Sequence, residues 1–351
     1  MSSQITRKST PDASAQPAAL ADGSLIDAKG RPVASAGTVA SVRPALEPPS
    51  HGRPAEPMPR APEGLLDLKT NAAFSVRGPD RESWLQGMQT ADLKAASYGG
   101  GAYAAFLGGK GRLVTDGFLF RHPDELLVAV PADRLEVLLA HLDKLLIMED
   151  AEVAKVPGLR HLRFFPGATP PSFPGASKIA GVWTGFALEL LLPEAQAEAL
   201  LRQIPARPQP AYVEAFRVAL GVPLFGRDLD DETVPLEGGL DRAISFDKGC
   251  YVGQEVVAMA TYRGRVTWNL VRLQVAGAPP ALGTLLDPKR AGKRGRITSA
   301  APLPGGQRSV LLGYVHKELI VPGSAVELED GRTATVLGLP YKSLPGSGVC
   351  A

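Results

Sequence analysis

Past the first sixty residues, short apolar runs of strand length alternate with segments of helical spacing, which restricts the chain to a mixed fold. The runs at 74–76 and 126–130 read as strands, and those at 102–107 and 112–120 read as a hairpin around the turn GGKG. Helical spacing is expected over 78–88 and again at a run of leucines, Leu135, Leu138, Leu139, Leu142, Leu145 and Leu146. This part of the chain is therefore an α+β unit.

The alternation continues and divides the chain further. A strand at 186–192 and a helix at 193–204 form a second α+β unit, and the stretch 205–210 reads as a linker. After a helix at 212–219 and a turn-rich loop, short strands alternate with Gly/Pro turns, which is typical of a small antiparallel barrel or sandwich. We expect an N-terminal α+β part, a second α+β part, a return segment and a C-terminal β-barrel, over residues 61–150, 151–208, 209–262 and 263–345.

Residues 1–60 contain nine prolines and no aromatic residue, and the first aromatic of the chain is Phe74. Such a stretch has too little apolar surface to offset the entropy of ordering, so we expect a disordered tail. An organelle transit peptide is the alternative. Asp12, Asp22 and Asp27 argue against it, because transit peptides avoid acidic residues.

The overall charge and the cysteine content indicate the cellular compartment and the kinds of partner, but they do not indicate an activity. With 38 basic and 36 acidic residues the formal charge is +2, which gives no global attraction to nucleic acid or to an acidic membrane. Cys350 is the penultimate residue, so a structural disulfide with Cys250 is not expected. No run of 18 apolar residues occurs, and the first ten residues lack the apolar core of a secretory signal. We expect a reducing, cytoplasmic setting.

The stretch DKGCYVGQE, residues 247–255, places one of the two cysteines between glycines. A nearby cation or a helix N-terminus favours the reactive thiolate form. Lys248 lies two residues before Cys250, and a helix is expected to start at 253–255 and to run to Tyr262. The thiol is therefore a candidate nucleophile, and a small, inert core residue is the alternative.

Spacing excludes three common classes of site. A papain-like protease has its histidine 130–150 residues after the cysteine, whereas His316 is the only histidine after Cys250. Zinc and iron–sulfur sites need three or four Cys/His ligands at close spacing, so no metal site is expected. The turn GGKGR is not a phosphate-binding loop, because Ala104 and Gly111 stand where that loop needs glycine and Ser/Thr.

Charged residues in three loops leave two interpretations each. Glu237, between Pro235 and Gly238, has room to hydrogen-bond a pterin-like ring, or it is a surface acid. A solvated loop is the simpler interpretation of the acidic group Asp228, Asp230, Asp231 and Glu232. The basic group either docks a polyanion or is a solvated loop; it comprises Lys289, Arg290, Lys293, Arg294 and Arg296.

Several motifs together resemble the YgfZ family, folate-binding relatives of the glycine cleavage T-protein that are associated with iron–sulfur cluster maturation. They are RxxxGVPxxGxD at 217–228, VPLE at 234–237, DKGCYVGQE at 247–255 and YRGR at 262–265. The KGCYxGQE core is the specific part. The resemblance runs from about Gly64 to Lys342 and leaves the N-terminal tail outside.

The resemblance implies a three-lobed arrangement of two α+β parts and a C-terminal antiparallel β-barrel around a central cavity that holds tetrahydrofolate or a derivative. It implies that Glu237 grips the pterin and that Cys250 is the family's signature cysteine. The remaining site residues that it implies are Lys248, Gly249, Tyr251, Gly253, Gln254 and Glu255.

Three positions qualify the resemblance. Met259 stands where the family usually has arginine, and Arg263 or Arg265 is expected to replace that cation beside the cofactor. The early TND triplet reads TAD at 90–92. Asp116 lies near the point of the hairpin at which T-protein enzymes carry a catalytic acid, so aminomethyl transfer is not excluded.

Three hypotheses follow from the motifs. The first is a folate-dependent accessory protein of iron–sulfur cluster assembly or repair, in which the Cys250 thiolate, supported by Lys248, handles a one-carbon adduct, a persulfide or a transient cluster. The second is an aminomethyltransferase that depends on Asp116. The third is a non-catalytic interaction or RNA-associated module that uses the loop 289–296. Iron–sulfur client or assembly proteins are the expected partners. We expect no membrane binding and no binding of nucleic acids, except that binding of tRNA is not excluded.

Overall fold

The computed structural model describes residues 58–165, 177–180, 187–263, 266–290 and 295–340. All of these residues belong to one of the two compact units of the chain, Leu46–Ala351. The tail expected over 1–60 lies outside the described residues except for its last three. Within the described ranges, no helix is long and apolar enough to cross a membrane.

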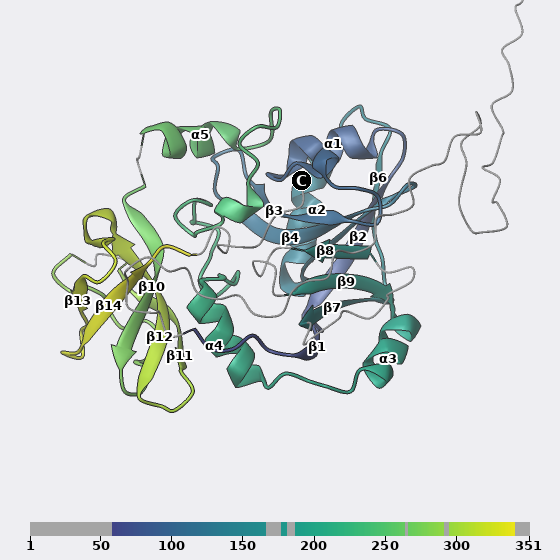
Figure 1. The fold of residues 1–351 in the computed structure, drawn as a ribbon. Helices are drawn as coiled ribbons and strands as arrows, with labels where there is room; N and C mark the ends of the chain where they lie inside the picture. Colours follow the sequence, from purple (N-terminus) through teal and green to yellow (C-terminus); the bar gives the residue numbers. More distant parts are fainter. Residues whose placement is uncertain (1–57, 166–176, 181–186, 264–265, 291–294, 341–351) are drawn as a thin grey trace, which may run out of the picture. The chain divides into compact units, whose positions relative to one another are not determined.

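The first sheet is antiparallel, and its helices cover one of its faces (Figure 1). Its strand order is β3-β4-β5-β2-β6, with β2 Asn71–Arg77, β3 Gly101–Leu107, β4 Leu113–Arg121, β5 Leu126–Pro131 and β6 Glu152–Lys155. Helices α1 (Arg81–Met88) and α2 (Ala132–Asp143) pack on one face through Trp84, Leu85 and Leu138. Because side chains alternate along a strand, the other face is free to build a second core. The strands, the hairpin and both helices expected in this part are confirmed, but α2 ends at Asp143, before Leu145 and Leu146 of the predicted run.

The second sheet has the order β1-β7-β9-β8 and is also antiparallel. Its strands are β1 Gly64–Asp67, β7 Leu159–Phe165, β8 Ser177–Ala180 and β9 Leu188–Pro193, and helix α3 (Glu194–Gln203) covers one face. Strand β1 joins this sheet although it precedes the whole first sheet in the chain, and β6 joins the first sheet although it follows α2. The two α+β parts thus exchange strands.

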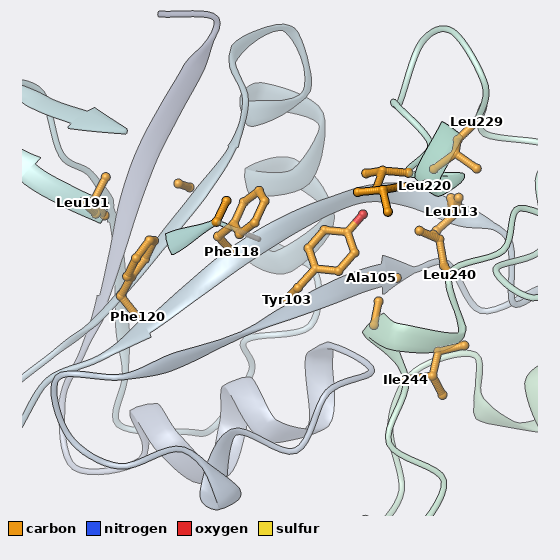
Figure 2. Packing of buried hydrophobic residues seen from close by; sticks show 14 of the residues in the cluster. Tyr103, Ala105, Leu113, Phe118, Phe120, Leu191, Leu220, Leu229, Leu240 and Ile244 are labelled. Carbon is orange, nitrogen blue, oxygen red and sulfur yellow. The ribbon is translucent and has the colours of Figure 1, made fainter. Parts of the chain in front are cut away.

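The inner faces of these two sheets meet in an aromatic core (Figure 2). Tyr103 and Phe118 project from neighbouring strands of the first sheet with ring centroids 5.2 Å apart. Other residues of the first sheet join them, and the second sheet and later segments of the chain add Phe165, Leu191, Leu220, Leu229, Leu240 and Ile244. Segments far apart in sequence are therefore held around the β3–β4 hairpin.

A buried polar group lies on the inner face of the second sheet. Glu189 accepts hydrogen bonds from Arg163 Nε at 2.6 Å and from His161 Nε2 at 3.0 Å. Asn71 Nδ2 donates to His161 Nδ1 at 2.9 Å, which assigns the histidine proton to Nε2. The His161 ring also meets Phe118 edge-on at 4.8 Å. Burial alone would raise the pKa of Glu189, but Arg163 and His161 lower it below its usual value.

The third sheet follows helix α4 (Pro210–Leu220), which packs on β11 and β12. Its strands are β10 Trp268–Ala276, β11 Ile297–Pro302, β12 Arg308–His316, β13 Ala325–Glu327 and β14 Thr333–Gly338, in the order β11-β12-β10-β14-β13. The expected antiparallel sheet is confirmed. The expected closed barrel is not, because β11 and β13 are the two edge strands of the sheet and do not pair with each other among the described strands.

The motif RxxxGVPxxGxD is structural and joins α4 to the third sheet. Arg217 Nη1 donates to Asp228 Oδ2 at 2.8 Å, and Arg217 Nη2 donates to Ser299 Oγ at 2.6 Å. Asp228 Oδ1 also accepts from Thr298 Oγ1 at 2.6 Å. The interpretation of a solvated acidic loop was therefore wrong for Asp228, which is buried because it holds the Arg217 charge; the other three acids of that group are exposed, namely Asp230, Asp231 and Glu232.

Candidate functional site

Three segments converge beside the first sheet: the β3–β4 hairpin, the turn 235–243 and the motif loop 245–253. Thr90 connects them, since its Oγ1 donates to the carbonyl of Ala243 and accepts from the N–H of Ala105 at 2.9 Å. The N–H of Ser245 donates to the carbonyl of Thr90 at 2.8 Å. The first residue of the TAD triplet thus holds the return segment against strand β3.

Lys248 anchors the motif loop. Its Nζ donates to the carbonyls of Gln86, Gln89 and Ala91 at 2.6, 2.7 and 2.7 Å. These carbonyls end helix α1 and begin the turn after it, where carbonyl groups lack helical partners. Burial lowers the pKa of Lys248 to about 8, while the charge of Asp92 acts in the opposite direction. At neutral pH the ammonium form therefore predominates and all three donors are present.

Two glycines let the motif loop contact the hairpin through backbone. Gly253 has φ +81°, and a Cβ there would lie 2.9 Å from the Gly108 carbonyl oxygen and 3.0 Å from Gly111 Cα. Gly111 has φ +67°, and a Cβ on it would lie 2.4 Å from Val256 Cβ. Val256 belongs to helix α5 (Gln254–Arg263), whose start after Gly253 confirms the expected helix. Both contacts require glycine.

Cys250 lies between two buried residues of this loop. The Lys248 and Tyr251 side chains turn inward, with Lys248 Nζ 5.2 Å from the Tyr251 ring centroid. Gly249 and Cys250 between them are exposed, and the sulfur has no disulfide partner among the described residues. The loop therefore presents its thiol to solvent on a fixed backbone, so the alternative of a buried core cysteine is wrong.

Tyr103, which is buried, and Asp116, which is half-buried, form a hydrogen-bonded acid pair on the hairpin. Tyr103 Oη donates to Asp116 Oδ2 at 2.6 Å, while the buried Asp116 Oδ1 has no partner among the described residues. Burial raises the pKa of Asp116, and the hydrogen bond from Tyr103 offsets only part of this. Burial, followed by the Asp116 charge, raises the pKa of Tyr103, and the charge of Arg242 opposes it. The pair can hold a proton beside the converging segments.

A second buried polar atom near this site lacks a partner. Gln89 is fully buried; its Oε1 accepts from the N–H of Ala91 at 2.5 Å, but its Nε2 has no acceptor among the described residues. Buried amide and carboxyl groups are ordinarily hydrogen-bonded. The Gln89 amide can donate a hydrogen bond, and the Asp116 carboxyl oxygen can accept one, from a bound polar group.

Glu237 lies half-buried in the turn 235–243, next in sequence to Leu236, which lines a pocket. Its N–H donates to the Val234 carbonyl at 2.9 Å, and its carbonyl accepts from the N–H of Leu270 on β10 at 2.7 Å. The pocket has a volume of about 360 Å³, and Leu236, Gly239 and Asp241 line one side of it. The backbone of the turn is thus fixed against the third sheet.

The remaining expected residues lie on helix α5 or just before it. Gln254 donates through its N–H to the Tyr251 carbonyl at 3.1 Å, and Glu255 is exposed in the first turn of the helix. Met259 is 41% exposed. Arg263 ends α5, and its side chain lies outside the described residues, as do residues 264–265.

Sequence reasoning missed Gln89, Tyr103 and Arg242. Tyr103 sits in an apolar run that reads as ordinary strand, and only the hairpin register, which pairs Ala105 with Asp116, brings its hydroxyl to that acid. Gln89 directly precedes the TAD triplet, which was a usable signal. No group of three or more His, Cys, Asp or Glu residues that could hold a metal ion occurs in the described part of the chain.

No family model matches the chain. The tRNA-modifying protein YgfZ of Cronobacter sakazakii is 26% identical over 300 residues, which cover 78% of this chain and 83% of that protein. The aminomethyltransferase of Rubrobacter xylanophilus is 28% identical over 312 residues, covering 80% and 84%. The mitochondrial iron-sulfur cluster assembly factor IBA57 homolog of Pyricularia oryzae is 28% identical over 316 residues, covering 78% of each.

Among solved structures, the glycine cleavage system aminomethyltransferase T from Bartonella henselae superposes with a TM-score of 0.69. Its sequence is 20% identical, and the match covers 81% of this chain and 88% of that one. At this identity the likeness concerns the fold alone. The α+β architecture implied by the motifs is thereby confirmed.

Proposed function

Because the chain is a YgfZ-type member of the glycine cleavage T-protein superfamily, we propose that it is a tetrahydrofolate-binding accessory protein of iron–sulfur cluster assembly or repair that uses the Cys250 thiol. The names of its relatives support this setting, since they include an iron-sulfur cluster assembly factor and a tRNA-modifying YgfZ protein. The proposed partners are iron–sulfur client or assembly proteins. The proposed location is the cytoplasm, although some relatives are named mitochondrial.

One observation carries the proposal: the motif loop exposes Cys250, while Lys248 anchors the loop to the end of helix α1 and the turn after it, and Tyr251 packs into the core. A thiol needed only for packing would be buried. An exposed thiol on a backbone anchored by three charge-assisted hydrogen bonds is held ready for a partner molecule. The effect of Lys248 on the thiol is in this view one of position, because its three donors are all engaged by carbonyls.

The residues of the site fit a reduced folate. Glu237 would accept hydrogen bonds from the pterin edge, while Gln89 Nε2 and Asp116 Oδ1 would gain the partners that they lack within the described ranges. When bound, the folate supplies ring nitrogens that carry a one-carbon unit. Tyr103 keeps the Asp116 side chain oriented, and the surrounding aromatic core excludes water from it.

Calorimetric titration with tetrahydrofolate tests the folate part of the proposal. We expect binding by the wild-type chain and a weakening of about 10- to 100-fold in Glu237→Gln, since a hydrogen bond to a charged group contributes about 1.5–3 kcal/mol. Asp231→Asn, an exposed acid of the neighbouring loop, is the matched control and should bind normally. Absence of binding by the wild type, or equal binding by both variants, would contradict the proposal.

The thiol part is tested in a host that lacks its own copy of this protein. We expect Cys250→Ser to fold normally, because the side chain is exposed, and to lower the activity of iron–sulfur enzymes as far as removal of the protein does. Full activity with the serine variant would exclude the thiol from the function.

Aminomethyl transfer to tetrahydrofolate is the second candidate, and the Tyr103–Asp116 pair favours it. Burial raises the pKa of Asp116, which makes its carboxyl group a better proton acceptor than an exposed aspartate. For an aminomethyltransferase, we expect turnover with a lipoyl-bound aminomethyl carrier and loss of that turnover in Asp116→Asn. Folate binding without turnover would leave the accessory function as the better description.

A further inference from the structure

The loop that joins α2 to β6 exposes two adjacent apolar side chains. Ile147 is 81% exposed and Met148 is 92% exposed, which makes them the most exposed large apolar residues in the part of the chain that the structure describes. Apolar residues scattered singly over a surface are ordinary, but two neighbours exposed this fully at one point offer a continuous apolar contact. Neither belongs to the core beneath the loop, so their apolar surface is available to another molecule.

The backbone of this turn is fixed by hydrogen bonds. Glu149 Oε2 accepts from the N–H groups of Ile147 and Met148 at 3.2 and 3.1 Å. Directly before them, the carbonyl of Leu145 accepts from Trp84 Nε1 of helix α1 at 3.2 Å. The two exposed side chains are therefore held out from a closed turn and not from a loose tip.

The far end of the loop is tied to the start of helix α1. The N–H of Asp150 donates to Asp80 Oδ2 at 2.8 Å, and the N–H of Asp80 donates to the carbonyl of Asp150 at 3.1 Å. Helix α1 thus holds the loop on both sides of the apolar pair. A backbone ordered in this way loses little conformational freedom when the turn binds a partner.

The charges around the apolar pair are mostly negative. Residues 143–152 carry four exposed acidic residues and one exposed basic residue, a net charge of −3; they are Asp143, Glu149, Asp150 and Glu152, with Lys144. This charge attracts a basic rim and is repelled by an acidic membrane surface. It also opposes a symmetric dimer through this turn, because the same acidic residues would face each other across the two-fold axis.

We propose that Ile147 and Met148 insert into an apolar groove of a partner protein whose rim carries lysine and arginine side chains. Burial of the two side chains supplies the affinity, since the turn is already ordered. The surrounding acidic residues raise the association rate and select the partner. Neither Cys250 nor folate takes part in this contact, so it can be tested separately from the proposed function.

Photo-cross-linking in the host identifies the partner. The photoreactive residue benzoylphenylalanine replaces Met148 in the full-length chain, and in a control chain it replaces Leu282, which is 55% exposed. We expect a single protein to cross-link through position 148 and not through position 282, at a peptide in which apolar residues are flanked by lysine or arginine. A cross-link within the chain, a cross-link to another copy of it, or no cross-link would overturn the proposal.

Calorimetry with the purified partner measures the contribution of the apolar pair. Ile147→Ser and Met148→Ser change exposed side chains, so the fold should survive, and each should weaken binding by at least about tenfold. Leu282→Ser is the matched control and should bind as the wild type does. Equal affinities for all three variants would show that the partner binds elsewhere and would overturn the proposal.

The salt dependence of association tests the basic rim. The association rate should fall at least about threefold between about 50 and 300 mM salt, because exposed charges are screened over this range. Asp143→Asn should also lower the rate at low salt, whereas Asp231→Asn, an exposed acid of another loop, should not. A rate independent of salt would overturn the basic rim. Binding to phosphatidylserine vesicles that is lost in Met148→Ser would assign the turn to a membrane instead.

Discussion

At the scale of single residues, Asp116 is a side chain whose surroundings oppose its charge. One of its oxygens accepts from Tyr103 and the other is buried without a partner in the described part of the chain. Leaving a buried polar atom unpaired costs about 1–3 kcal/mol. Such a cost is tolerated where a ligand or a proton fills the position, so this residue carries information about function rather than about packing.

Replacing Asp116 by Asn should stabilise the protein at neutral pH. The folded state raises the pKa of Asp116, so it binds the proton more tightly than the unfolded state, and the free energy of unfolding falls as the pH rises from the unfolded value toward the folded one. We expect Asp116→Asn to be more stable than the wild type at pH 7 and to lose this part of the slope, as measured by urea unfolding from pH 4 to 8. Asp231→Asn should change neither. A less stable Asp116→Asn protein with an unchanged slope would contradict the assignment.

At the scale of elements, the contact between the motif loop and the β3–β4 hairpin depends on backbone rather than on side chains. Gly253 and Gly111 approach each other so closely that no side chain fits between them. The hairpin that carries Asp116 and the loop that carries Cys250 are consequently held in one arrangement. A change in either glycine should disturb both functional residues.

Comparing Gly253→Ala with Gly99→Ala separates the stability lost through this contact from the stability lost through backbone strain. The two glycines have φ +81° and +80°, but a Cβ on Gly99 meets nothing within 4 Å. We expect Gly99→Ala to lose about 1 kcal/mol from the left-handed conformation and Gly253→Ala to lose about 2–4 kcal/mol, because overpacking adds to the strain. Thermal and urea unfolding of both variants measure this. Equal losses would mean that the loop can move away from the hairpin at no cost.

Most elements could be predicted from the sequence because each has a local signal. The leucines of α2, the hairpin around GGKG and the start of α5 after Gly253 were all found in this way. The register of a hairpin and the face that a residue takes are not local, so the Tyr103–Asp116 pair could not be found. Lys248 was recognised, but its three carbonyl partners lie about 160 residues away in the chain.

At the scale of the whole molecule, the Arg217–Asp228 ion pair joins helix α4 to the third sheet. Both side chains are buried, and Thr298, Ser299 and the Glu214 carboxylate complete their hydrogen bonds. A buried pair of this kind adds little net stability, but breaking it leaves an uncompensated charge. Its function is therefore to define how the parts connect.

Removing one partner should destabilise the protein strongly. We expect Asp228→Ala to lower the free energy of unfolding by about 3–5 kcal/mol, because the buried Arg217 Nη1 loses its carboxylate acceptor and only Glu214, at the other edge of the guanidinium, remains paired with the charge. The double variant Arg217→Met/Asp228→Leu should recover much of this loss, and Asp231→Ala should stay within about 0.5 kcal/mol of the wild type. Urea unfolding curves measure these free energies. A small loss of stability in Asp228→Ala would show that water reaches the Arg217 side chain.

The strand exchange between the first two sheets delays strand pairing during synthesis on the ribosome. Gly64 pairs with Phe165, so β1 leaves the exit tunnel about one hundred residues before its partner strand is made. At about 5–20 residues per second, this apolar edge waits some 5 to 20 seconds with no neighbour. Nascent chains halted between these two points should therefore recruit chaperones and aggregate when released.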